Sequence, residues 1–362
     1  MIKVAIVGCG KIADSHATQI QRIDGCEIVG VCDNEELMAE QLCDRFNVKR
    51  YFSNLSQLLN EVKPDVVHIT TPPQSHLMIG KQCLESGCHI YVEKPFAVNA
   101  NEAEILIKTA YQTGHKLTVG HDEQFSEVSE RMRKLFKDGY LGDAPVHIES
   151  FWCYDLSDVT YAKTLLDDKQ HWSRKLPGGL LHNLISHGVA KIAAFLTSDN
   201  PHVMAYGFVS PVLKKLGEEN LIDELRVVIH DEKGTTAYFT FSSQMQPSLH
   251  QLYIYGTKNG ILIDEDKRII IKLRGKKYKS FAEHFFPPVI FAGQYLANLT
   301  HNVRRFLAMD FHMDYSKKQL IEAFYRSIND DKTVPIPYRE IILTTRIMDD
   351  IFKQTHPIQP IF

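Results

Sequence analysis

The chain has 362 residues, of which 44% are hydrophobic and 23% are charged, as in an ordinary globular protein. A formal net charge of −3 gives no basic surface for nucleic acid and no attraction to an anionic membrane. No apolar run approaches the ~20 residues of a spanning helix. The chain enters a strand pattern at once, without the charged and apolar regions of a signal peptide. The length predicts two domains.

Cysteine usage points to a reducing compartment. The seven cysteines are an odd number and contain no Cys-x-x-Cys pair, which predicts reduced, mostly buried thiols in a cytoplasmic protein. Cys9, in a glycine-rich turn, is an alternative candidate for a reactive thiol. The 17 histidines form no HExxH motif and no Cys/His cluster with ligand spacing, so we predict no metal.

The first third of the chain alternates strand and helix patterns. Helical spacing is seen at residues 12–23, 35–46 and 102–111. Strands that are apolar on both faces and separated by helices predict a doubly wound parallel sheet, the Rossmann type of α/β domain, over residues 1–122. The predicted strands are residues 3–8, 27–33, 65–70, 89–93 and 116–120.

After residue 123 the pattern changes to longer strands, several of which alternate polar and apolar residues. This alternation is typical of an antiparallel sheet with one packed and one open face. A helix is predicted at 128–138, and residues 291–354 read as largely helical. We therefore predict an α+β domain, built on a mostly antiparallel sheet, over residues 123–362. Its predicted strands are residues 146–154, 202–210, 225–231, 235–243, 250–257 and 268–275.

The segment VAIVGCGKIADSH carries a G-x-G-x-x-A pattern between the first strand and the first helix. Gly8 permits a tight turn, Gly10 leaves room for a pyrophosphate, and Ala13 allows close packing of helix on strand. The helix amino terminus offers free N–H groups to the anion. The pattern predicts a dinucleotide site.

Asp33 ends the second strand, 25 residues after Gly8. An acidic residue there accepts hydrogen bonds from the ribose hydroxyls and repels a 2′-phosphate, so NAD is favoured over NADP. The alternative role for Asp33 is to cap the helix that follows it.

Three further motifs follow the later strands of this domain: TTPPQSH (70–76), EKP (93–95) and TVGHDEQF (118–125). With GCGKIADSH at the start, this order resembles the Gfo/Idh/MocA family of glucose–fructose oxidoreductase and inositol dehydrogenase relatives. The likeness is close over the first 145 residues and looser through HWSRKLPGGLLHNLISH (171–187) and LYIYGTKNGIL (252–262).

The resemblance implies a Rossmann domain over residues 1–122 and a second domain, over residues 123–362, whose open sheet binds the substrate and makes subunit contacts. It also implies oxidation or reduction of a sugar or polyol hydroxyl with a nicotinamide cofactor. It makes Lys94 the active-site lysine and His187 the active-site histidine. Two positions depart from the usual pattern: Asn183 replaces an aspartate, and Gln124 replaces a frequent basic residue.

The motifs and the resemblance together give two sets of site residues. The cofactor set is Gly8, Gly10, Lys11, Ile12, Asp33, Thr71, Pro72, His76, Glu93 and Lys94. The substrate set is Lys94, Gln124, Trp172, Asn183 and His187, of which Lys94, Asn183 and His187 are the catalytic candidates.

The expected chemistry is proton handling beside a hydride transfer. The unperturbed pKa of a histidine, ~6.5, lets His187 take or give a proton near neutrality. Lys94 would stabilise developing alkoxide charge, or act as the base if burial lowers its pKa. Asn183 and His187 are four apart and would share one helix face. An asparagine supports imidazolium less than an aspartate does, which leaves the proton to His187 and Lys94.

Each of these residues also has a structural interpretation. Lys94 could be a solvated loop lysine paired with Glu93, and His187 or His182 could simply pack a helix. Trp172 could contact substrate or anchor the core. At the level of function, the alternatives to a dehydrogenase are a non-catalytic dinucleotide-binding regulator, or sugar hydrolysis through transient oxidation.

The open sheet face predicts a homodimer or homotetramer. Alternatively, helical residues 295–307 and 317–328 could cover part of that face. Composition predicts neither nucleic acid nor a membrane as a partner.

Overall fold

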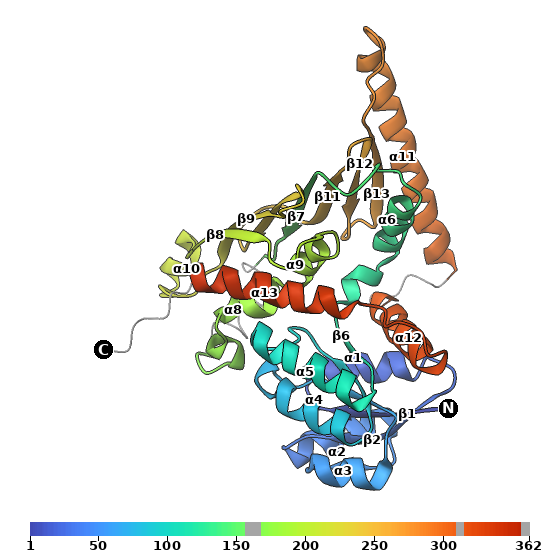
Figure 1. Cartoon of the computed structure of the whole chain (residues 1–362), viewed down its shortest axis with the longest axis vertical. Coiled ribbons are helices and arrows are strands. Elements are labelled where there is room, and N and C mark those ends of the chain that lie inside the picture. Colours follow the sequence, from blue (N-terminus) through green and yellow to red (C-terminus); the bar gives the residue numbers. More distant parts are fainter. Residues whose placement is uncertain (156–167, 309–314, 356–362) are drawn as a thin grey trace. The chain divides into compact units, whose positions relative to one another are not determined.

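The computed structural model describes residues 1–155, 168–308 and 315–355 (Figure 1). The chain forms two compact units, and its boundaries fall after Asp122, Tyr315 and Arg346. The predicted division placed all of residues 123–362 in one domain, whereas Ser316–Arg346 belongs with the first unit. The physical reason is that this segment bonds to the first sheet: the Tyr325 hydroxyl lies 2.8 Å from His68 Nε2, and Lys116 Nζ donates to the carbonyl of Ser327.

The first unit confirms the predicted Rossmann sheet. Its six strands are all parallel, in the order β3-β2-β1-β4-β5-β6. All four residues of β4 and all three of β6 are buried, as expected for strands covered on both faces. The two-residue strand β3 was not predicted, because it is too short to carry a periodic pattern. The strands are β1 (Ile2–Val7), β2 (Cys26–Cys32), β3 (Tyr51–Phe52), β4 (Val66–Ile69), β5 (His89–Val92) and β6 (Leu117–Val119).

Helices connect these strands as right-handed βαβ units require. Several begin with side-chain caps: Asn54 accepts from Gln57 N, and Asn99 accepts from Glu102 N. Helices α4 and α5 lie side by side (Figure 1). The helices of this unit are α1 (Lys11–Ile20), α2 (Glu36–Phe46), α3 (Leu55–Val62), the short η1 (Pro73–Ser75), α4 (His76–Glu85), α5 (Ala100–Thr113) and most of α12 (Tyr315–Asn329).

The second unit contains the predicted open, mostly antiparallel sheet. Its seven strands run in the order β13-β12-β11-β7-β10-β9-β8, and only the β7–β10 pair is parallel. The strand β12, which follows a tight turn at Thr257 and Lys258, was not predicted as a separate element. The strands are β7 (His147–Trp152), β8 (His202–Phe208), β9 (Glu224–His230), β10 (Thr236–Ser242), β11 (His250–Tyr255), β12 (Asn259–Asp264) and β13 (Ile269–Arg274).

One face of this sheet is packed by helices and the other carries exposed aromatic side chains, including Tyr206, Tyr238 and Tyr255. Of the segments offered as a cover for part of this face, residues 295–307 belong to a helix that runs along the edge strand β13, where Ile271 on that face is buried (Figure 1). Residues 317–328 belong to the first unit. The remaining helices are η2 (Asp122–Phe125), α6 (Glu127–Lys137), η3 (Trp172–Lys175), α8 (Gly179–Leu184), α9 (Ser186–Ala193), α10 (Pro211–Lys215), α11 (Ala282–Leu307) and α13 (Tyr338–Thr355), whose last residues belong to this unit.

Gly188 sets the position of α9 on the sheet. A Cβ at this residue would lie 2.5 Å from the ring of Phe239 and 2.7 Å from Cβ of Trp152. These distances are too short for carbon atoms, so only glycine lets the helix approach β7 and β10 this closely. The neighbouring residue His187 is placed by the same contact.

Gly188→Ala is expected to reduce the free energy of unfolding by about 1–3 kcal/mol, because α9 must move away from the sheet. The measurement is urea denaturation followed by circular dichroism. Gly293→Ala is the matched control, because no heavy atom lies within 4 Å of a Cβ there. An alanine at that helical position should leave stability unchanged or raise it by up to ~1 kcal/mol. Equal effects of the two substitutions would contradict the packing argument.

Candidate functional site

The glycine turn after β1 forms an open cradle at the start of α1. Gly8 has φ +96°, and a Cβ there would lie 2.7 Å from the backbone nitrogen of Thr71, so the turn packs directly on the loop after β4. Around Gly10, by contrast, no heavy atom lies within 4 Å of a Cβ position. Gly10 is also the N-cap of α1 and makes no side-chain cap. The cradle therefore presents backbone N–H groups to open space, which fits a phosphate.

Lys11 and Ile12 lie exposed in the first turn of α1, beside this cradle. Asp33 holds the turn from the end of β2: its Oδ2 accepts from Cys9 N at 2.7 Å and its Oδ1 accepts from Glu35 N at 3.0 Å. The N-cap of α2 is Glu35, which has no side-chain cap, so Asp33 does not itself cap that helix; its carboxylate bonds the glycine turn and the residue just before α2.

Cys9 is fully buried, and burial together with the Asp33 carboxylate raises the pKa of its thiol far above the ordinary value. A thiol that stays protonated is a poor nucleophile, so the reactive-cysteine alternative is not supported. All seven cysteines are free thiols.

The loop after β4 is tied to the loop after β5 by His76. This fully buried ring has Nε2 2.8 Å from the carbonyl oxygen of Thr71 and Nδ1 3.1 Å from that of Phe96. Burial lowers the pKa of His76 despite these two carbonyls. His76 therefore sets the spacing of two loops, while Pro72 is exposed on the loop surface.

Glu93, at the carboxyl end of β5, is a buried carboxylate inside a polar network. Its Oε1 lies 2.7 Å from His16 Nε2 and 3.1 Å from Lys317 Nζ, and its Oε2 accepts from Lys94 N at 3.0 Å. A Cβ at Gly120, after β6, would lie only 3.1 Å from Glu93 Oε1. The Lys94–Pro95 peptide bond is cis.

The charges of this network determine the protonation of its members. Burial by itself would raise the pKa of Glu93, but Lys317, His16 and Lys94 hold it well below its usual range. Burial lowers the pKa of Lys94, and Lys317 adds to this, while Glu93 and Asp122 oppose it. Lys94 is half-buried, and the ion pair of Glu93 is with Lys317. The picture of a solvated Glu93–Lys94 pair is therefore not supported.

The network continues through a chain of buried rings. His16 Nδ1 lies 2.7 Å from His68 Nδ1, and His68 Nε2 lies 2.8 Å from the hydroxyl of Tyr325. His68 also stacks on Tyr91 with the rings almost parallel. Burial lowers the pKa of His68 well below its usual value, so this histidine is neutral in the folded protein near pH 7.

Two more ionisable groups lie beyond β6. Burial, then the positive charge of Lys94, lowers the pKa of His121 to about 3. Burial raises the pKa of Asp122, whose carboxylate lies 3.8 Å from Lys317 Nζ. Lys94 is therefore bordered by a neutral imidazole and by the charged pair of Glu93 and Lys317.

In the second unit, Asn183 and His187 lie on consecutive helices. The prediction that they share a face of one helix is wrong, because α8 ends at Leu184 and α9 begins at Ser186, with a bend at Ile185. Asn183 is half-buried and His187 is buried. His182 stacks on Phe352 at 4.8 Å, which is the structural role expected for it.

The other two predicted substrate residues differ in exposure. Gln124 is buried, and its Nε2 lies 3.4 Å from the carbonyl oxygen of Ala190 in the middle of α9. Trp172 is half-buried, with its ring 5.2 Å from that of His171.

His187 is surrounded by a cluster of polar and aromatic side chains. The sequence did not predict this cluster. The ring of Trp152 lies 5.5 Å from that of His187 and 4.4 Å from that of His250. Lys191 lies over the same indole and forms a buried ion pair with Glu265. The sequence predicts a strand at residues 146–154, which contains Trp152, but nothing in the sequence pairs this residue with His187.

The described residues contain neither a metal-binding cluster nor a membrane-spanning helix. No group of three or more His, Cys, Asp or Glu side chains in residues 1–155, 168–308 and 315–355 could hold a metal ion. In the same ranges no helix is long and apolar enough to cross a membrane.

The sequence matches the patterns of two family domains. Residues 2–121 match one described as "Oxidoreductase family, NAD-binding Rossmann fold", and residues 129–262 match the "GFO/IDH/MocA C-terminal domain". The glycine cradle thus lies within a domain of the NAD-binding Rossmann type.

Curated relatives share part or most of the chain. D-glucoside 3-dehydrogenase of Escherichia coli is 31% identical over 39% of this chain, and the match spans 41% of that protein. Myo-inositol 2-dehydrogenase of Thermotoga maritima is 19% identical over 77% of this chain and 82% of that protein. Among solved structures, the WlbA dehydrogenase of Bordetella pertussis, in complex with NADH and UDP-GlcNAcA, has a TM-score of 0.78 at 16% identity, covering 98% of this chain and 95% of that one.

Lys317→Met is expected to reduce the free energy of unfolding by about 3–5 kcal/mol, because it leaves the Glu93 carboxylate buried without its strongest counter-charge. Glu93→Gln in the same background removes that charge, so the double variant should be more stable than Lys317→Met alone. Urea denaturation of both single variants, the double variant and the unsubstituted chain measures the coupling. If the changes in unfolding free energy caused by Lys317→Met and Glu93→Gln simply add in the double variant, Glu93 and Lys317 do not form the proposed ion pair.

Proposed function

Since the chain belongs to the Gfo/Idh/MocA oxidoreductase family, we propose that it is an NAD-dependent dehydrogenase or reductase that acts on a CH–OH group of a sugar, polyol or sugar derivative. The observation that carries the proposal is the buried network of Glu93, His16 and Lys317, which holds Lys94 at the carboxyl end of β5. Open parallel sheets bind their ligands at this edge.

The fit of the cradle to a dinucleotide supports the cofactor. Gly8 brings the turn against Thr71, and Gly10 leaves the helix terminus open for the pyrophosphate. Asp33, already fixed by two backbone N–H groups, would receive the ribose hydroxyls and disfavour a 2′-phosphate. Nicotinamide, when bound, supplies the hydride chemistry, so the protein needs only to position the substrate and handle one proton.

We assign the first proton-handling role to Lys94. An ammonium group stabilises negative charge that develops on the substrate oxygen, and does so more strongly in a half-buried site than in water. The lowered pKa of Lys94 also makes its proton easier to transfer. The Glu93 carboxylate, by accepting from the Lys94 backbone N–H, positions this lysine.

We assign the second proton-handling role to His187, and we propose that a polar substrate binds beside it. The indole N–H of Trp152, the Ser186 hydroxyl and His250 Nε2 are buried and have no hydrogen-bond partner among the described residues. Buried polar groups need partners, and the hydroxyls of a sugar or polyol supply both donors and acceptors. A nucleotide-linked sugar belongs to the same class of ligand.

The second candidate function is a non-catalytic regulator that binds NAD. Asn183, at the position where an aspartate is usual, favours it, because an asparagine cannot stabilise an imidazolium by charge. Turnover of NADH with a panel of keto-sugars, or of NAD with sugars and polyols, distinguishes the two. Cofactor binding without turnover on any compound would support the regulator.

The exposed aromatic face of the second sheet supports a homodimer or homotetramer as the working form. Light scattering at micromolar concentration tests it.

NADH is expected to bind more tightly than NADPH, because Asp33 repels the 2′-phosphate. The test is fluorescence titration of both cofactors against the unsubstituted chain and Asp33→Asn. Asparagine removes the charge and keeps one acceptor oxygen, so it can bond only one of the two backbone N–H groups that the aspartate bonds. The preference for NADH should therefore narrow by roughly 10-fold, an effect of about 1.4 kcal/mol. If Asp33→Asn keeps the same preference for NADH over NADPH, Asp33 does not act by repelling the 2′-phosphate.

The pH profile of Lys94 variants separates the two roles that the residue could play. If Lys94 acts protonated, turnover falls as the pH rises through its pKa, which burial places below the ordinary value of 10.5. Lys94→Arg, which stays charged, should then keep some turnover and lose this alkaline decline. Lys94→Met should lose about 10²–10⁴-fold in kcat. Inactivity of the arginine variant together with an acid-side dependence on Lys94 would instead identify the lysine as the base.

A further inference from the structure

Helix α11 is amphipathic in the inverse sense: its polar side chains face the protein and its apolar side chains face away. Gln294 and Asn298 each bond both backbone groups of one residue in the edge strand β13, Lys272 and Ile270 respectively. Asn302 continues this row one turn later, donating to the carbonyl of Lys267. The polar row thus satisfies the free edge of the sheet.

The opposite side of α11 carries an apolar seam with coiled-coil spacing. Its members are separated alternately by four and three residues, which is the spacing of heptad positions a and d over three heptads. Every member is exposed, with Phe285 at 69%, Leu296 at 63% and Phe306 at 67%. The apolar seam consists of Phe285, Val289, Ala292, Leu296, Leu299, Val303 and Phe306.

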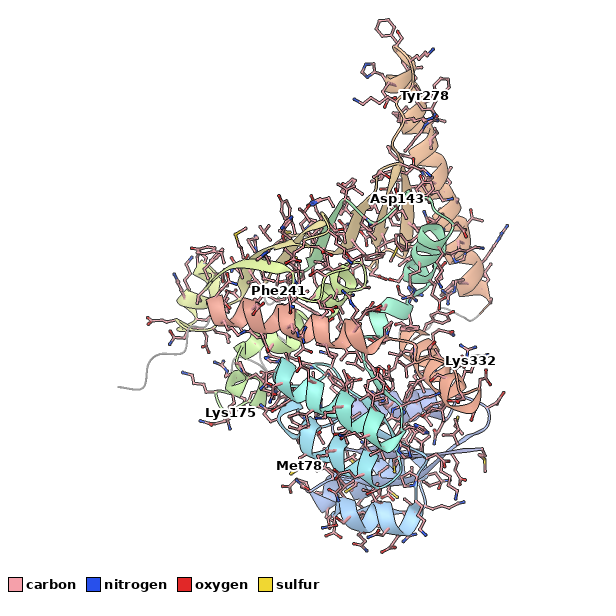
Figure 2. The ribbon with its side chains drawn as sticks, viewed as in Figure 1. Met78, Asp143, Lys175, Phe241, Tyr278 and Lys332 are labelled. Atoms are coloured by element: carbon pink, nitrogen blue, oxygen red, sulfur yellow. The ribbon has the colours of Figure 1, made fainter. Side chains whose placement is uncertain are left out.

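Within one copy of the chain, few contacts stabilise helix α11. Of its 26 residues only Asn298 is buried. Pro287 and Pro288 lie inside the helix and supply no backbone N–H, so two intrahelical hydrogen bonds are lost. Figures 1 and 2 show this part of α11 extending beyond the sheet, with Tyr278 at its outer end. Isolated helices of this kind are marginal in water, and they are normally stabilised by packing an apolar face.

The seam is complementary to itself when reversed. Read in order, its side chains are Phe, Val, Ala, Leu, Leu, Val and Phe, which is almost a palindrome. In an antiparallel pair with two-fold symmetry, Phe285 faces Phe306 of the partner subunit and Val289 faces Val303 of the partner subunit. The small Ala292 faces the larger Leu299 of the partner subunit, and Leu296 lies at the axis against its own copy. We propose that the apolar seam of α11 docks against the same seam of a second copy of this chain, as an antiparallel helix pair.

Size and composition both favour a second copy over other occupants. Two such seams would bury on the order of 1,000 Å² in total, about the threshold for a specific interface. The positions that flank the seam, such as Phe286, Tyr295 and Leu307, are uncharged and add no repulsion. A helix that lies on a lipid surface carries Lys and Arg along its polar face, whereas no Lys or Arg occurs between Glu283 and Arg304.

Leu296→Glu tests the seam by analytical ultracentrifugation of the full chain at micromolar concentration. Two carboxylates would meet at the axis, so the dissociation constant of one association step should rise on the order of 100-fold or more. Leu296 is exposed within one copy, so the variant should keep its circular dichroism spectrum and its melting temperature. Tyr206→Glu, on the open sheet face, is the matched control and should leave this association step unchanged.

Cysteine cross-linking tests the antiparallel register. Leu296→Cys should form a disulfide-linked dimer under mild oxidation, because the two side chains meet at the axis. Val289→Cys should not, because its two copies would lie roughly 20 Å apart along the pair. A mixture of Val289→Cys and Val303→Cys chains should cross-link. The unsubstituted chain, with its native thiols, gives the background.

Four results would overturn the proposal: a monomer at these concentrations, dissociation by Tyr206→Glu but not by Leu296→Glu, no cross-link at Leu296→Cys, or equal cross-links at positions 289 and 296. Flotation with vesicles of phosphatidylcholine and phosphatidylglycerol tests the alternative that the apolar seam binds a lipid surface. Co-flotation that Leu296→Glu abolishes, without any self-association, would assign the seam to a lipid surface instead.

Discussion

The buried carboxylate of Glu93 is the constraint on which the rest of the first unit depends. A charge in that position is tolerated only because Lys317 and His16 contact the same oxygen, and those residues come from α12 and α1. The carboxylate thus draws together three parts of the chain that are distant in sequence. Its other oxygen fixes the backbone of Lys94, so the arrangement that stabilises the unit also positions the residue proposed to act on substrate.

The same edge of the sheet is shaped by glycines that allow close backbone contact. Gly8 lets the turn after β1 touch Thr71, and Gly120 leaves room for the Glu93 carboxylate. Bulkier residues at either position would push the loops apart. The glycine cradle, Lys94 and the Glu93 carboxylate would then no longer keep their present distances from one another. Gly188 plays the corresponding part in the second unit, where it brings α9 and His187 onto the sheet. The geometry of the candidate site is therefore a consequence of packing distances.

Local sequence patterns predicted the elements well and their long-range partners poorly. The five longer strands of the first sheet were predicted from their buried apolar runs. Strand β3 was not predicted because it is very short, and β12 was not predicted because only a tight turn separates it from β11. Glu93 and Lys94 could be singled out from motif and strand position. Lys317 and His16 could not, since nothing in the sequence pairs residues 93 and 317. The bend at Ile185 was equally hidden, because helical spacing alone does not show where one helix ends and the next begins.

Helix α11 shows why periodicity needs the structure before it has a meaning. Its apolar spacing alone is that of any helix packed on a core, and such a helix would turn its leucines inward. Three amide side chains decide otherwise: Gln294, Asn298 and Asn302 bond the backbone of the edge strand and its turn, and so fix the rotation of the helix. Once that rotation is set, the seven apolar side chains can only face away from the sheet. An apolar surface with this order can be removed from water by pairing with its own copy, and the sheet edge that the amides satisfy is at the same time closed to aggregation.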